Sequence, residues 1–148
     1  MIVKQTFNID DIKRVLCDPV IYEAIAGDGC PDSKYFEPPM GRRYQYIAGY
    51  VDSEIIALMV YHEHNDGRKC HIQVLPKFRV KHATEFTELA LEFRGNKTLY
   101  AEIPMYFKSL INFAKKRGFE VIDEVDNNYT KNGVKYDTKI LRFKDGIC

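Results

Sequence analysis

Basic residues gather in the middle of the chain, between an expected strand and an expected helix. Lys77, Arg79 and Lys81 lie there, with His82 beside them. The first N–H groups of a helix have no partner inside it, and the helix dipole adds positive potential at the same end. A strand that leads through a basic turn to a helix N-terminus therefore favours a phosphate-bearing ligand. A solvated surface turn without a ligand is the alternative.

Three histidines form a second candidate group. The run Asn65-Asp66-Gly67-Arg68 predicts a hairpin turn, and with Asp66-Gly67 at its centre His62 would pair with His71. Residues two apart share a face of a strand, so His62, His64 and His71 would lie together. They could bind a divalent metal, or His71 could act as a general base. We favour an exposed polar patch, and no metal site is predicted.

Composition restricts the function classes. The 148 residues suit one domain spanning 1–148, and 22 basic against 21 acidic residues give a net charge of +1. That balance lacks the basic excess of a nucleic-acid binder. The sequence has no long apolar run and no leader pattern, and its four cysteines form no C-x-x-C pair. We therefore expect a cytoplasmic protein without membrane, nucleic-acid or zinc binding.

Hydrophobic periodicity predicts alternating strands and helices. Strands are expected over Ile2–Phe7, Tyr44–Val51, Ile55–His64, Lys69–Val74, Thr98–Ile103, Phe119–Val125 and Val134–Phe143. Helices are expected after the N-cap Asn8, over Val20–Ala26, from Ala83 or Thr84 to Phe93, and over Met105–Arg117. The order predicts an α/β (α+β) fold, in which a mixed sheet of about seven strands carries helices on both faces.

Two stretches resemble the GCN5-related N-acetyltransferase (GNAT) superfamily, whose fold has the same order of elements. The run His71-Ile72-Gln73-Val74-Leu75-Pro76-Lys77-Phe78-Arg79 is similar to the family's fourth strand and cofactor loop. Ala101-Glu102-Ile103-Pro104 and the run from Asn112 to Phe119 are similar to its fifth strand and following helix. In the cofactor loop, however, His82 and Thr84 stand where the family has small residues.

The resemblance implies a site for acetyl-coenzyme A. Backbone groups of Val74 and Leu75 would hold the pantetheine arm, and the turn would hold the pyrophosphate. That turn comprises Arg79, Val80, Lys81, His82, Ala83 and Thr84. His71 or Glu102 would be the base for the amine, and Tyr106 could be a displaced acid for the thiolate. For Tyr106, core packing is the alternative.

Two functions follow from the resemblance. One is an N-acetyltransferase that moves an acetyl group from acetyl-coenzyme A to an amine on a small molecule or protein. The other is a non-catalytic protein of the same fold, similar to phage proteins associated with head assembly, that acts through contacts with phage structural proteins. A homodimer is compatible with either function.

Overall fold

The computed structural model describes residues 1–144. Within these residues, seven strands form one mixed sheet in the order β1-β2-β3-β4-β5-β7-β6. Neighbouring strands are antiparallel except β4 and β5. The strands are β1 (Ile2–Gln5), β2 (Tyr44–Val51), β3 (Glu54–His64), β4 (Gly67–Val74), β5 (Leu99–Pro104), β6 (Phe119–Lys131) and β7 (Val134–Phe143).

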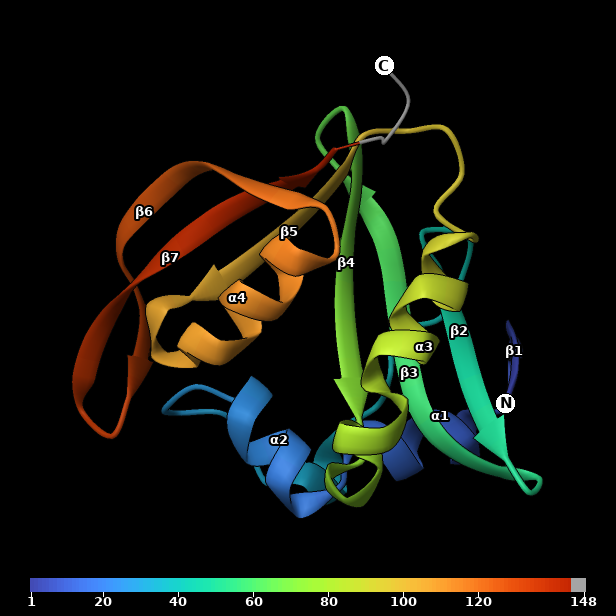
Figure 1. The fold of residues 1–148 in the computed structure, drawn as a ribbon. Coiled ribbons are helices and arrows are strands. Elements are labelled where there is room, and N and C mark those ends of the chain that lie inside the picture. The colour runs from blue at the N-terminus through green and yellow to red at the C-terminus, as the bar shows by residue number, and fades with distance from the viewer. Residues whose placement is uncertain (145–148) are drawn as a thin grey trace.

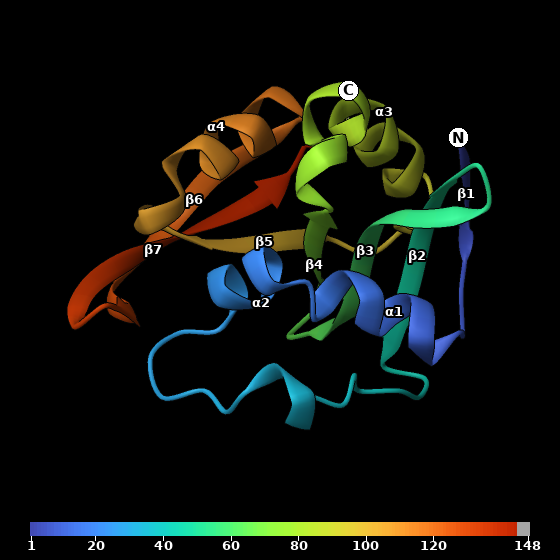
Figure 2. The same ribbon diagram turned by 90° about the horizontal axis from the view of Figure 1, so that it is seen from below.

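Helices cover both faces of the sheet, as the sequence predicts. In Figure 2, α1 and α2 lie on one side of the sheet, and α3 and α4 lie on the other. The helices are α1 (Ile9–Leu16), α2 (Pro19–Ile25), α3 (Arg79–Leu91) and α4 (Lys108–Lys116), with short 3₁₀ turns η1 (Ser33–Tyr35), η2 (Pro76–Phe78) and η3 (Met105–Phe107). No helix among residues 1–144 combines the length and apolar character that a bilayer crossing needs.

Two hydrophobic cores follow from this layering. Under α3 and α4, residues such as Met59, Tyr61 and Phe86 are almost fully buried. On the other face, α1 and α2 bury Leu58 and Ile21, among others. Alternate residues of β3 thus serve opposite cores, as expected of a strand that is covered on both faces.

The first helices start where the sequence predicts. The Asn8 side chain accepts a hydrogen bond of 3.1 Å from the Asp11 N–H, and Asp18 caps α2 in the same way ahead of Pro19. These side chains satisfy N–H groups that have no partner inside the helix. The turn at Asp52-Ser53 is also confirmed, since both residues adopt the left-handed conformation between β2 and β3.

The hairpin between β3 and β4 differs from its prediction by two residues. The turn falls on Asn65 and Asp66, so His62 pairs with Lys69, and His71 pairs with Val60. Asn65 supplies the left-handed residue of the turn, with φ 51°. Gly67 belongs to β4 instead, because a Cβ there would lie 2.1 Å from the Thr98 carbonyl oxygen. A shift of two residues preserves the face of every side chain.

The start of α3 and the end of β6 differ most from their predictions. α3 begins at Arg79 rather than at Ala83 or Thr84. Without the glycines of the GNAT loop, the segment consists of residues that a helix accepts readily, and it continues directly from η2. β6 runs on from Val125 to Lys131, because irregularities in its pairing with β7 absorb the polar residues that suggested an end.

Candidate functional site

β4 and β5 diverge after a very short pairing. They are aligned only at Arg68 with Leu99 and at Lys69 with Tyr100. The Arg68 N–H donates to the Thr98 carbonyl over 2.8 Å and fixes the point from which the strands separate. Figure 1 shows β4 and β5 leaving that point in different directions. The sequence analysis missed this divergence, and the glycine at position 67 was its only local signal.

The divergence leaves backbone groups of β4 without a strand partner on the β5 side. The Leu75 N–H donates to Ile56 of β3 over 2.8 Å, and the Leu75 carbonyl accepts from Phe78 over 2.9 Å. Because successive residues of a strand direct their backbone groups to opposite sides, Val74 and Ile72 face β5. Of the two residues predicted to hold the pantetheine arm, Leu75 is therefore engaged within the fold, and Val74 faces the divergence.

The Val74 carbonyl already has a partner within the chain. Arg79, five residues later, donates to it from Nε over 2.9 Å. The Arg79 side chain therefore bends back from the first residue of α3 to the end of β4. Two residues predicted to contact the cofactor thus contact each other.

The N-terminus of α3 lacks a capping side chain. Phe78 holds the N-cap position without a side-chain hydrogen bond, and the first turn contains no acidic residue. Residues 79–84, predicted as a turn, are the first turns of this helix. The Arg79 N–H donates to the Pro76 carbonyl, so it is the N–H groups after Arg79, together with the helix dipole, that are compatible with an anion.

The side chains of residues 77–84, around the helix start, differ in exposure and packing. Val80 is fully exposed, and Lys81, Thr84 and Arg79 are also exposed. The His82 ring packs against Phe78 at 6.0 Å between centroids, and Ala83 is half-buried. Lys77 lies over the same Phe78 ring, 5.0 Å from its centroid. Along the chain, Lys77 therefore precedes the helix start and Lys81 follows it.

The two histidines nearest the centre of the sheet form a direct pair. The rings of His62 and His71 stack with centroids 5.1 Å apart and an interplanar angle of 11°. Their Nε2 atoms are 2.9 Å apart, so one ring donates a proton to the other. His62 Nδ1 lies 3.1 Å from the Glu63 carbonyl, which can only accept. We infer that His62 carries its proton on Nδ1 and that His71 donates from Nε2.

This tautomer leaves the His71 Nδ1 lone pair without a hydrogen-bond partner among residues 1–144. Although solvent reaches the His71 ring, the protein around it disfavours the charged form and is the main cause of a lowered pKa, to about 4. Positive charge on His62 and Lys69 contributes in the same direction. His71 is consequently neutral at pH 7 and able to accept a proton.

Glu102 lies on the same face of the sheet, on β5, and belongs to a separate group of contacts. Its carboxylate binds the Lys69 ammonium and lies 3.4 Å from His64 Nε2. The His64 ring also packs edge-on against Tyr100. The three imidazoles therefore do not converge on one point, because His64 turns toward Glu102 while His62 and His71 face each other. Lys69, which links the two strands, was not singled out from the sequence.

Tyr106 lies apart from both groups, in an aromatic cluster after β5. Its ring packs edge-on against Phe107 and Tyr136, with centroids 5.0 and 5.2 Å away, and lies 6.3 Å from Tyr129. The residue is 42% exposed. Tyr106 thus lies in an aromatic cluster at the surface and belongs to neither hydrophobic core, so the alternative of core packing was wrong.

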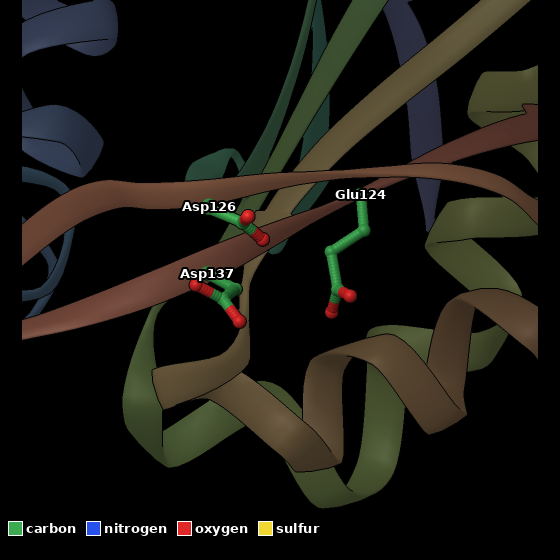
Figure 3. A group of neighbouring side chains, drawn as sticks. All are labelled: Glu124, Asp126 and Asp137. Atoms are coloured by element: carbon green, nitrogen blue, oxygen red, sulfur yellow. The ribbon is translucent and has the colours of Figure 1, made fainter.

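Among residues 1–144, the structure places one further set of potential metal ligands together, and the sequence analysis did not identify it. Glu124, Asp126 and Asp137, from β6 and β7, have carboxylate oxygens within 4.8 Å of one another (Figure 3). Lys139 already pairs with Glu124 over 2.9 Å, and the Asn127 N–H donates to Asp137 over 2.9 Å. The acidic residues of 123–126 were the signal in the sequence. Carboxylates grouped in this way could hold a hard cation.

Comparisons with solved structures identify the fold. The E. coli ribosomal-protein-S18-alanine N-acetyltransferase is 18% identical with a TM-score of 0.69, covering 99% of this chain and 98% of its own. The Staphylococcus aureus Mu50 N-acetyltransferase is 12% identical with a TM-score of 0.73, covering 97% of each chain. A ribosomal-protein-alanine N-acetyltransferase from Brucella melitensis is 12% identical with a TM-score of 0.71, covering 96% of this chain and 98% of its own.

The sequence itself matches no protein-family model and no curated protein. The likeness therefore lies in the three-dimensional arrangement, over nearly the whole chain. The fold is that of the GCN5-related N-acetyltransferases. The predicted fold class is confirmed, including the mixed sheet of seven strands and the helices on both of its faces.

Proposed function

We propose that this protein is an N-acetyltransferase that moves an acetyl group from acetyl-coenzyme A to an amine. The observation that carries the proposal is the divergence of β4 from β5 beside the uncapped start of α3. It leaves backbone hydrogen-bonding groups next to a site that favours anions, in the fold of known acetyltransferases.

The residues around α3 fit the cofactor in charge and in backbone geometry. The N-terminal N–H groups of α3 would hold the pyrophosphate, with Lys81 and Lys77 as nearby cations. Val74 would offer its backbone to the pantetheine arm. Because Arg79 occupies the Val74 carbonyl, cofactor binding would require Arg79 to release that oxygen and turn toward the phosphates.

We assign proton transfer from the amine to the face of the sheet opposite α3. When the amine attacks the thioester carbonyl, it loses a proton, and the departing thiolate can take one up. His71 would accept the amine proton on Nδ1, since the protein around the ring keeps it neutral and its Nε2 is engaged with His62. The Glu102 carboxylate, which is paired with the Lys69 ammonium, would orient the amine. Tyr106, which is 42% exposed, would supply the proton to the thiolate.

A direct test is titration of the purified protein with acetyl-coenzyme A in a calorimeter, followed by a screen of amines with a thiol reagent that reports free coenzyme A. Micromolar binding and thiol release that depends on the amine would support the proposal. A His71→Gln variant that binds the cofactor with unchanged affinity and loses turnover would support His71 as the base. No binding at millimolar acetyl-coenzyme A would reject the proposal.

A non-catalytic role in assembly is the second candidate, and the Arg79–Val74 hydrogen bond favours it. A carbonyl satisfied within the chain needs no ligand, and the larger residues at 82 and 84 point the same way. Its partners would be structural proteins of a phage or a second copy of this chain. Absence of cofactor binding together with a stable complex with a phage head protein would support this role.

A further inference from the structure

A cavity of about 690 Å³ lies at the end of the sheet remote from the start of α3. Its walls come from the residues after β1, the turn before β2, the end of β3 and the loop after α3. In Figure 1 this is the end at which α3 finishes. Because α3 has 13 residues, the cavity lies ~20 Å along the helix from the proposed pyrophosphate site.

The cavity lining is strongly cationic, although the whole chain is nearly neutral. It contains Arg42, Arg43, Arg68, Arg94 and Lys97, against one acidic residue, Glu63. Arg68 donates to the Arg94 carbonyl over 2.8 Å and so stabilises the C-terminal end of α3, as cations do at that end of a helix. The Arg94 side chain donates likewise to Leu91 over 2.9 Å. The remaining cations of the lining have no such structural role.

Two loops from distant parts of the sequence present those remaining cations. The Tyr44 N–H donates to the Gly41 carbonyl over 3.2 Å, which closes a tight turn with Arg42 and Arg43 at its tip. Lys97 lies on the loop after α3. Within residues 1–144, Arg42 and Lys97 make no side-chain hydrogen bond or ion pair. Arg43 lies 3.9 Å from Glu63, and both of these side chains are largely exposed.

Apolar side chains line the same cavity and remain open to solvent. Phe7 is 74% exposed and Met40 is 42% exposed. Exposed apolar groups in a cavity are typical of sites that pack against a ligand, and the nearby arginines would pair with its charge. We propose that this cavity binds a phosphorylated small molecule of nucleotide size. Arg42, Arg43 and Lys97 hold the phosphates of this ligand. Phe7 and Met40 pack against the ring system that carries the phosphorylated group.

Binding of ATP, observed by NMR and calorimetry, tests the assignment, with pyrophosphate and adenosine as partial probes. The backbone signals of Gly41 and Gly95 should shift on addition of ATP, and acetyl-coenzyme A should not displace it. The double variant Arg42→Glu/Lys97→Glu should weaken ATP binding about tenfold or more, because two attractive charges become repulsive. The matched variant Lys77→Glu/Lys81→Glu, at the start of α3, should leave ATP affinity unchanged.

Three outcomes would overturn the assignment: no ATP binding at millimolar concentration, signal shifts confined to the start of α3, or unchanged affinity in Arg42→Glu/Lys97→Glu. Pyrophosphate should bind more weakly than ATP and lose affinity in the same variant. Adenosine binding that survives in this variant while pyrophosphate binding is lost would support the proposed division into ring and phosphate contacts. A failure of the acetyltransferase proposal leaves the ATP, pyrophosphate and adenosine binding measurements unaffected, since none of these three requires coenzyme A.

Discussion

Arg79 and Val74 are joined by a hydrogen bond of 2.9 Å from the guanidinium Nε to the backbone carbonyl. It links the first residue of α3 to the last residue of β4, across the segment that we propose as the cofactor site. A ligand that needs the Val74 carbonyl must therefore compete with Arg79.

Replacement of Arg79 tests this competition. In Arg79→Glu we expect acetyl-coenzyme A affinity to fall tenfold or more, because a carboxylate would stand where phosphate is expected. Since Arg79 is exposed, loss of its hydrogen bond should lower the free energy of unfolding by only about 1 kcal/mol. Calorimetry and urea denaturation measure the two quantities.

Arg79→Ala is the matched control, since it frees the Val74 carbonyl without adding negative charge. It should bind acetyl-coenzyme A better than Arg79→Glu does. Equal affinities for both variants and the unaltered protein would mean that Arg79 takes no part in binding.

The sequence predicts the fold well where local signals are strong and agree with one another. Asn8 before an amphipathic run and the turn residues Asp52-Ser53 mark boundaries that the structure confirms. The boundary errors arose where two signals competed. Gly67 suits a turn, but close approach of the Thr98 backbone requires a glycine within β4, and Asn65 takes the turn instead.

Less of the candidate site than of the fold could be predicted from the sequence. The face shared by His62 and His71 followed from the period of the strand, and a register error of two residues left it intact. Lys69 and the divergence of β4 from β5 depend on contacts between strands some thirty residues apart, which no local pattern encodes. The cationic cavity likewise combines two loops that are distant in sequence.

Glu102 is expected to support stability as well as function. Its contact Lys69 is only 16% exposed, so Glu102→Gln would leave a poorly hydrated ammonium without a counter-charge. We expect the free energy of unfolding to fall by about 1–2 kcal/mol, measured by urea denaturation at pH 7.

Glu37→Gln provides the control for this effect. Glu37 pairs with Lys13 over 2.9 Å, but its side chain is 75% exposed. Its replacement should therefore cost less than about 0.5 kcal/mol. A loss in Glu102→Gln no larger than in Glu37→Gln would show that the Lys69 contact does not stabilise the fold.

His71 should make stability depend on pH below neutrality. Its pKa is about 4 in the folded protein, below its ordinary value of 6.5, because the surrounding protein disfavours the charged ring. Between these values the unfolded chain binds a proton that the folded chain does not, so stability falls as the pH drops from about 6.5 to about 4. Thermal melts of the unaltered protein and of His71→Gln across this range would show a shallower slope for the variant. Parallel slopes would contradict the assignment.

Gly67 should be among the least replaceable glycines of the chain. A Cβ at this position would lie 2.1 Å from the Thr98 carbonyl oxygen, a backbone atom that also accepts the Arg68 N–H. Gly67→Ala must therefore push β4 and β5 apart at the point where they diverge, and we expect a loss of about 3 kcal/mol or more. Gly133→Ala is the control: it meets no atom within 4 Å, but its φ of 76° adds strain of only about 1 kcal/mol. Gly67→Ala should have a much lower melting temperature than Gly133→Ala in thermal denaturation. Gly67→Ala should also lower acetyl-coenzyme A affinity if the divergence forms the cofactor site. Equal melting temperatures for the two variants would mean that the strands separate there without cost.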